Sequence, residues 1–242
     1  MLRGTFYGLG VGPGESGLLT TKAAQILGRT DILCVPSSAA GRESRALSAA
    51  EPYLKAGAPV VELLFPMSKE NSVLEAHWLA AAEKVAELLV KYDAVTFVTI
   101  GDPLTYSTFS YLLATLRRLH PAVNVEIVPG VTSFHAAAAL LQIPLIEGEE
   151  RLAVVSAPVT AEELAALLRY FATIVILKVS AAFDHTLDLL REQGITQDVY
   201  LVSHCGSREE FCTKNPFELY GQPVDYLSLL IVKRRLKQLH IN

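Results

Sequence analysis

Short runs of β-branched and aromatic residues alternate along the chain with longer segments of helical periodicity. Such runs favour extended backbone and predict β-strands at residues 5–9, 31–35, 60–64, 94–100, 124–128, 152–156, 174–178, 199–203 and 226–233. The periodic segments between them predict helices over 74–91, 106–119, 132–141 and 161–170. Strands that alternate with helices indicate an α/β fold.

Three local signals refine this picture. The clearest helix, 74–91, has apolar residues every three or four positions: Leu74, Trp78, Ala81, Val85 and Leu88. Thr160 is a typical N-cap for the helix over 161–170, because its hydroxyl can accept a hydrogen bond from a backbone N–H. The cations and proline of 117–121 end another helix and predict a seam between two α/β domains, 1–120 and 121–242. Domains this small are expected to share an extensive interface that contains a cleft.

The composition is that of a folded protein, since the 242 residues are 51% hydrophobic and 8% aromatic. With 21 basic and 25 acidic residues the formal net charge is −4, which disfavours nucleic acid as a partner but allows a locally basic pocket. Residues 127–146 carry no charged side chain, but Pro129, Gly130 and Pro144 interrupt them. A strand, a turn and a buried helix are therefore expected there, and no membrane span.

The cysteines indicate a reducing compartment, the cytoplasm, because the chain has three and none lies in a CxxC motif. Glycine and proline also interrupt the N-terminus too early for the apolar region of a signal peptide. His204, Cys205 and Cys212 follow no standard metal-ligand spacing, so no metal site is predicted.

A glycine-rich segment, Gly8 to Gly14 followed by Glu15, comes directly after the first predicted strand. It fails the GxGxxG dinucleotide fingerprint in both registers, because Pro13 or Glu15 stands where the third glycine is needed. Proline also lacks the N–H that would bind a phosphate, and a glutamate would repel one. The segment is either a backbone that turns sharply to admit a bulky ligand or a plain tight turn.

Two further strands end in bends that can carry chemistry. Gly101 and Asp102 follow the strand over 94–100, and the carboxylate of Asp102 can hold an ammonium or a ribose hydroxyl, or simply cap the turn. Thr132 and Ser133 follow the Pro-Gly bend after 124–128, and their hydroxyls can cap a helix or bind a ligand. Each signal is weak alone, but together they predict two similar bends, one in each half of the cleft.

These segments, taken in order, resemble the tetrapyrrole methylases of cobalamin and sirohaem synthesis: 8–14 with 18–20, then 101–103, then 129–133. The resemblance covers essentially the whole chain. One branch, the precorrin-2 C(20)-methyltransferases, which include the cobalt-factor II enzymes, is also similar at 65–68, 176–179 and 226–230. The chain departs from that branch at 68–70, which is Ser-Lys-Glu where Thr-Arg-Asp is common, and at Leu177, where Met is common.

The resemblance implies two α/β domains, distinct from a Rossmann fold, with the active site in the cleft between them and a homodimer as the usual assembly. It implies S-adenosyl-L-methionine as the methyl donor, bound by eight positions of this chain: Gly101, Asp102, Leu104, Thr105, Thr132, Ser133, Lys178 and Leu227. Pro13 would line the tetrapyrrole side.

The implied reaction is methyl transfer to the C-20 meso carbon of precorrin-2 or cobalt-factor II. Because the sulfonium leaves readily, the protein mainly has to position the two reactants. Tyr106 and Glu15 are candidates for the base that removes the proton afterwards, a role that water could also fill. The substrate carries several carboxylates, so cations in polar loops after strand ends are candidate contacts: Arg42, Arg45 and Lys69.

Three alternatives remain open from the sequence. A sibling enzyme would methylate another ring carbon or uroporphyrinogen. The glycine-rich start suggests a nicotinamide-dependent oxidoreductase, which Pro13 and Glu15 disfavour. A non-catalytic ligand-binding module would share the same loops without turnover.

Overall fold

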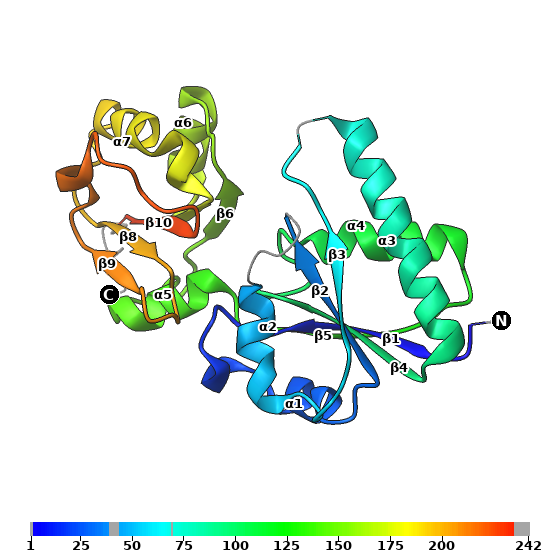
Figure 1. Cartoon of the computed structure of the whole chain (residues 1–242). Helices are drawn as coiled ribbons and strands as arrows, with labels where there is room; N and C mark the ends of the chain where they lie inside the picture. The colour runs from blue at the N-terminus through cyan, green and yellow to red at the C-terminus, as the bar shows by residue number, and fades with distance from the viewer. Residues whose placement is uncertain (1, 39–43, 69, 235–242) are drawn as a thin grey trace. The chain divides into compact units, whose positions relative to one another are not determined.

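The computed structural model describes residues 2–38, 44–68 and 70–234. The chain divides into two compact units, Met1–Ser133 and Phe134–Asn242 (Figure 1). This division lies later than the seam expected after residue 120, because the strand β5 (Asn124–Val128) pairs with the first strand of the chain. The α/β class expected from the sequence is confirmed.

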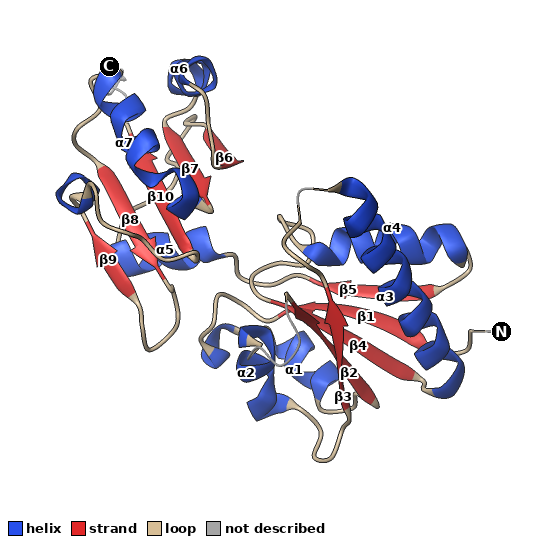
Figure 2. Ribbon diagram, turned by 45° about the horizontal axis from the view of Figure 1, so that its top comes forward, coloured by secondary structure: helices blue, strands red, loops and turns tan. Residues whose placement is uncertain are grey.

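The described residues of the first unit form a five-stranded parallel sheet in the order β3-β2-β4-β1-β5 (Figure 2). Besides β5, its strands are β1 (Thr5–Gly10), β2 (Ile32–Ser37), β3 (Val60–Leu64) and β4 (Ala94–Thr99). The chain's first strand thus lies inside the sheet, with Thr5 aligned to Ala94 on one side and to Asn124 on the other.

Helices cover both faces of this sheet. The longer pair, α3 (Asn71–Lys91) and α4 (Thr108–Leu119), packs on the face that presents Phe6 and Phe97. The shorter pair, α1 (Thr21–Leu27) and α2 (Arg45–Ala50), packs on the face that presents Leu9. Successive residues of a strand point to opposite faces, so β1, β2 and β4 each contribute to both apolar cores.

The described residues of the second unit form a mixed sheet in the order β6-β7-β10-β8-β9. Its strands are β6 (Leu152–Ser156), β7 (Thr173–Leu177), β8 (Val199–Ser203), β9 (Phe211–Thr213) and β10 (Ser228–Lys233). β6 and β7 run parallel, whereas β10 runs antiparallel to both β7 and β8. The helices are α5 (Ser133–Leu141), α6 (Ala161–Tyr170) and α7 (Phe183–Glu192). Thr160 caps α6 in a full capping box with Glu163, which confirms the predicted N-cap.

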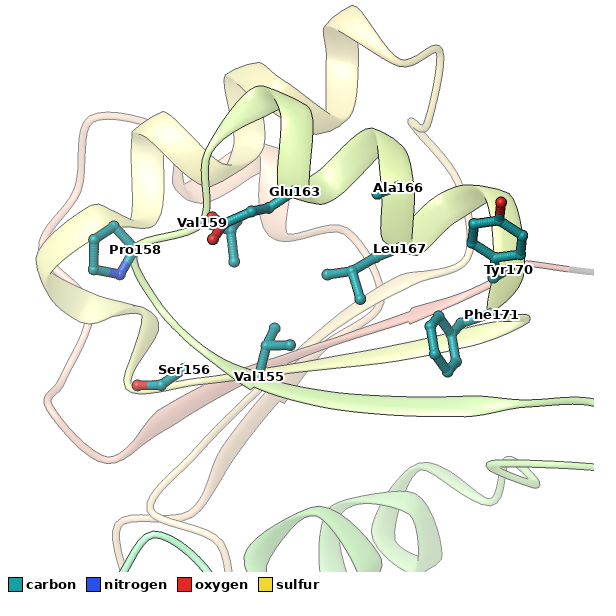
Figure 3. A pocket seen from close by; sticks show the side chains of 9 residues that line it. All are labelled: Val155, Ser156, Pro158, Val159, Glu163, Ala166, Leu167, Tyr170 and Phe171. Atoms are coloured by element: carbon teal, nitrogen blue, oxygen red, sulfur yellow. The ribbon is translucent and has the colours of Figure 1, made fainter.

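A cavity of about 400 Å³ lies beside β6 and α6, where Val155, Leu167 and Tyr170 are among the residues that line it (Figure 3). None of the residues predicted for the active site lines this cavity. Within the described residues, every helix is too short or too polar to cross a lipid bilayer.

The three cysteines should differ sharply in reactivity. Burial raises the pKa of the Cys34 thiol to about 12, so at pH 8 only about one molecule in ten thousand carries its thiolate. Cys205 is also buried, whereas Cys212 is exposed. An aromatic disulfide reagent at pH 8 should label one thiol of the native protein and three after unfolding. Cys212→Ser should abolish the native signal, and fast labelling that survives this substitution would contradict the assignment.

Candidate functional site

The three bends singled out in the sequence come together at the carboxyl edge of the first sheet. They follow β1, β4 and β5, and β1 lies between the other two strands. Backbone hydrogen bonds extend the β1–β4 pairing beyond the strands, from Val11 N to Thr99 O at 3.0 Å and from Gly101 N to Gly12 O at 2.7 Å. Ligands of open α/β sheets bind at this edge.

Three glycines allow the bends to touch. A Cβ atom added to Gly130 would lie 2.1 Å from the carbonyl oxygen of Gly101, and one added to Gly10 would lie 2.5 Å from the same oxygen. These neighbours are backbone atoms, which cannot move aside as a flexible side chain can. Gly101 itself has a φ of +72°, and its missing side chain would face open space. The close approach of the bends therefore requires glycine at positions 10 and 130, where any side chain would clash with backbone. It favours glycine at position 101, where the backbone is left-handed.

The carboxylate of Asp102 fastens two bends together. Its Oδ2 accepts from Gly130 N at 3.1 Å, whereas its Oδ1 accepts from Leu104 N at 2.9 Å and from the Thr105 hydroxyl at 3.1 Å. An ionised carboxylate offers about four acceptor positions, and these bonds occupy three of them. Asp102 is therefore first of all a structural acceptor that sets the distance between the β4 and β5 bends.

Apolar and polar side chains both reach the surface beside Asp102. Leu104 and Tyr106 are 58% and 51% exposed, and Tyr106 has a left-handed φ of +50°. The hydroxyl of Ser107 caps α4 through Phe109 N and also bonds the Thr99 hydroxyl at 3.1 Å. An exposed leucine next to a carboxylate and a phenol suits a ligand with both apolar and hydroxyl-bearing parts.

Thr132 and Ser133 are half-buried between the β5 bend and the start of α5. The expectation that the Asp102 bend and this bend belong to different halves of the molecule is wrong, because β4 and β5 flank β1 in one sheet. The cations and proline at 117–121 end a helix, which is a local event, and the first sheet takes one more strand after it.

The two donor positions predicted farther along the chain lie in the second unit. Lys178 follows β7 and Leu227 precedes β10, so the antiparallel register Leu229 to Leu177 brings both to one edge of that sheet. Both side chains are exposed, and Lys178 has a left-handed φ of +56°.

The remaining predicted residues differ in accessibility. Pro13 is buried in the loop after β1, and Glu15 is exposed just before a 3-10 turn, Ser16–Leu18. Arg45 is exposed at the first position of α2, which follows β2. Arg42 and Lys69 lie outside the described residues.

The sequence did not reveal Gly10 and Gly130 as a contact pair, and it suggested Asp102 as a ligand contact or a cap of its own turn, without the bond to Gly130 that joins two bends. A signal was present, because each of β1, β4 and β5 is followed by glycine within two residues. Three glycines at three strand ends favour backbone crossing over three independent turns.

Comparison with known proteins agrees with this geometry. A profile of the tetrapyrrole (corrin/porphyrin) methylases matches residues 5–219. A probable cobalt-precorrin-2 C(20)-methyltransferase of Methanocaldococcus jannaschii is 36% identical, covering 94% of this chain and 95% of its own. The cobalt-precorrin-2 C(20)-methyltransferase of Salmonella typhimurium is 34% identical, covering 97% of this chain and 98% of its own.

Solved structures share the fold at lower identity. A cobalt precorrin-4 methyltransferase superposes with a TM-score of 0.72 at 22% identity, covering 95% of this chain and 94% of its own. A uroporphyrin-III C-methyltransferase of Thermus thermophilus, complexed with S-adenosyl homocysteine, gives a TM-score of 0.63 at 22% identity, covering 94% and 96%. From the profile match over most of its length and these full-length relatives, the chain belongs to the tetrapyrrole (corrin/porphyrin) methylases.

Proposed function

We propose that this protein transfers a methyl group from S-adenosyl-L-methionine to the C-20 meso carbon of precorrin-2 or its cobalt-loaded form, in cobalamin biosynthesis. The observation that carries the proposal is the identity of 34–36%, over nearly the whole of both chains, to relatives named for this reaction. A precorrin-2 C(20)-methyltransferase of a Sinorhizobium species, 30% identical over 95% of both chains, agrees with it.

The donor, in this proposal, binds at the carboxyl edge of the first sheet. Gly101, Asp102, Leu104 and Thr105 supply a side-chain-free bend, a carboxylate with acceptor capacity left, an exposed apolar surface and a hydroxyl. Thr132 and Ser133 add hydroxyls from the bend that Asp102 holds in place. In the second unit, we propose Lys178 and Leu227 as further donor contacts and, in the first, Pro13 as a tetrapyrrole contact.

Catalysis then consists mainly of positioning. The sulfonium is an excellent leaving group, so the protein has to hold the methyl carbon about 3–3.5 Å from the meso carbon and in line with the departing sulfur. The enamine-like meso carbon attacks without prior deprotonation and loses its proton afterwards. A rigid bend built from backbone contacts and carboxylate bonds suits this task.

If positioning dominates, neither candidate base should be essential. Tyr106→Phe and Glu15→Gln should each keep the turnover number within about threefold of the unmodified protein, whereas loss of a general base typically costs 10²–10⁴-fold. Both side chains are exposed, which leaves room for water to take the proton. Single-turnover rates across pH 6–9 check this, and a drop of two orders of magnitude in either variant would identify that residue as the base.

Of the three cations predicted to bind substrate carboxylates, Arg45 is the one that lies within the described residues. Arg45→Glu should raise the KM for the tetrapyrrole about tenfold and leave the KM for the donor unchanged, because the reversed charge repels only the anionic substrate. Arg117→Glu, an exposed charge reversal in the last turn of α4, is the matched control and should change neither value. Equal effects of the two substitutions would point to the overall field instead of a local contact.

We also propose that the enzyme acts as a homodimer in the cytoplasm. Free cysteines at 34, 205 and 212 support a reducing compartment. Light scattering of the purified protein measures the assembly directly.

Incubation with the donor and precorrin-2, metal-free or cobalt-loaded, tests the function, with product mass and the NMR position of the new methyl as readouts. Methylation at C-20 is expected. Methylation at another carbon would favour a sibling activity, for which a precorrin-4 C(11)-methyltransferase of Mycobacterium tuberculosis, 30% identical over 78% of this chain, is the precedent. Donor binding without transfer would favour a binding module, and preferential binding of a nicotinamide dinucleotide would favour an oxidoreductase.

A further inference from the structure

His204 lies directly after β8, with its ring between two carboxylates. Its Nε2 is 2.9 Å from Asp225 Oδ2, and its Nδ1 is 3.6 Å from Glu209 Oε2. The histidine side chain is only 10% exposed, whereas those of Asp225 and Glu209 are 53% and 71% exposed. Because carboxylate oxygens only accept, the Nε2–H donates to Asp225. A buried ring thus anchors an otherwise exposed carboxylate.

Asp225 in turn holds the backbone of Leu227. Its other oxygen, Oδ1, accepts from Leu227 N at 3.4 Å, and the Leu227 carbonyl accepts from His204 N at 3.0 Å. Both backbone groups of Leu227 are therefore fixed by the His204–Asp225 pair, one directly and one through the carboxylate. The next residues are held too, since the hydroxyls of Ser203 and Ser228 bond at 2.7 Å.

The backbone conformation of His204 indicates that its ring has a positioning role. Its φ of +50° is left-handed, a conformation in which glycine is the least strained residue. A bulky side chain persists in such a position when its surroundings hold it there. Gly206, two residues on, already supplies a glycine with positive φ to the same loop, so the turn does not depend on a histidine for its shape.

We infer that His204 is a positioning residue for methyl-donor binding, which acts through Asp225 by fixing the segment that presents Leu227. The inference rests on the proposed function, in which Leu227 contacts the donor. It assigns His204 no contact with substrate and no proton transfer. Its effect belongs to the donor-binding step, because the segment 225–227 must be ordered before the donor can use it.

Substitutions that separate the ring from the fold test this. His204→Gly removes the ring and relieves the left-handed backbone, so the protein should stay folded. The dissociation constant for S-adenosylhomocysteine and the KM for the donor should each rise about tenfold, as expected for loss of a charge-assisted hydrogen bond, with kcat at saturating donor changed less than about twofold. His204→Gln, which can return a donor near Nε2, should recover most of the affinity. Glu209→Gln, at the longer contact, is the matched control and should bind as the unmodified protein does.

The outcomes divide cleanly. If the unmodified protein binds and transfers methyl but His204→Gly binds the homocysteine product equally well, the inference is overturned while the proposed function stands. The same holds if kcat at saturating donor falls as much as the affinity, because the effect would then not be confined to the donor-binding step. Should His204→Gly not fold, Asp225→Ala, at the exposed partner, decides the question with the same expectation and the same overturning result. If the unmodified protein neither binds the donor nor transfers methyl, the proposed function is wrong, and this inference, which rests on it, is wrong as well.

Discussion

Gly130→Ala should destabilise the first unit by about 3 kcal/mol and abolish donor binding, a large stability effect for a single added methyl group. The new Cβ would lie 2.1 Å from the Gly101 carbonyl oxygen and 2.8 Å from the Gly10 Cα. Both neighbours are backbone atoms at strand ends, so relief requires the β1, β4 and β5 ends to separate. That separation would also break the bond from Gly130 N to Asp102.

Urea unfolding and calorimetric titration with S-adenosylhomocysteine measure the two effects. Gly28→Ala is the matched control, because Gly28 ends α1 in helical conformation and its added Cβ would come no closer than 3.6 Å to its neighbours. The control should unfold within about 0.5 kcal/mol of the unmodified protein. A Gly130→Ala protein as stable as this control would show that the strand ends are looser than the structure has them.

Asp102→Ala should lower kcat/KM for the donor by at least about 100-fold, the largest activity effect expected of a side-chain removal here. Three bonds to one carboxylate are lost, each typically contributing about 1.5–3 kcal/mol when the acceptor is charged, although some of that total is regained by water. The β4 and β5 bends then lose the group that joins them. We expect the defect in the donor step even at saturating tetrapyrrole.

Asp102→Asn refines this prediction. An amide keeps one accepting oxygen but turns a donating NH₂ toward a backbone N–H on the other side, so its loss should approach that of alanine. Asp93→Asn removes the charge of an 82% exposed carboxylate whose partner is Arg3, and it serves as the control with unchanged kinetics. If Asp102→Ala bound the donor normally, the carboxylate would not be what holds the bends at their working distance.

The strands were predictable because short runs of β-branched and other apolar residues stand out between polar turns. β3, β5, β6 and β8 have the bounds that the pattern indicates. The short helices were not, since α1 and α2 have seven and six residues, too few for a helical repeat to stand out. α7 was not predicted either, although Phe183, Leu187 and Leu190 recur at helical spacing and are buried together. β9 has only three residues at a sheet edge, which is too short for a recognisable strand pattern.

The site was predictable by its parts and not by its arrangement. The bends at Gly101 and Gly130 were identified as ligand-binding candidates from residue type and place, because strand ends with glycine and a polar neighbour are favourable binding positions. That these bends adjoin depends on β1 inserting between β4 and β5, and linear order does not reveal which strands are neighbours. The His204–Asp225 pair, 21 positions apart, likewise needs the β8–β10 pairing to meet.

The interior place of β1 also has a consequence for how the chain folds during its synthesis. β1 leaves the ribosome before both of its partners, which start about 90 and about 120 residues later, at Ala94 and Asn124. At a typical elongation rate of about 5–20 residues per second, several seconds pass before either partner strand is synthesised, and during this time the apolar side chains of β1 have no strand to pair with. We expect nascent chains released before β5 to aggregate or to recruit a chaperone, and we expect refolding to be slow for a chain of this length, because its central pairings close long loops.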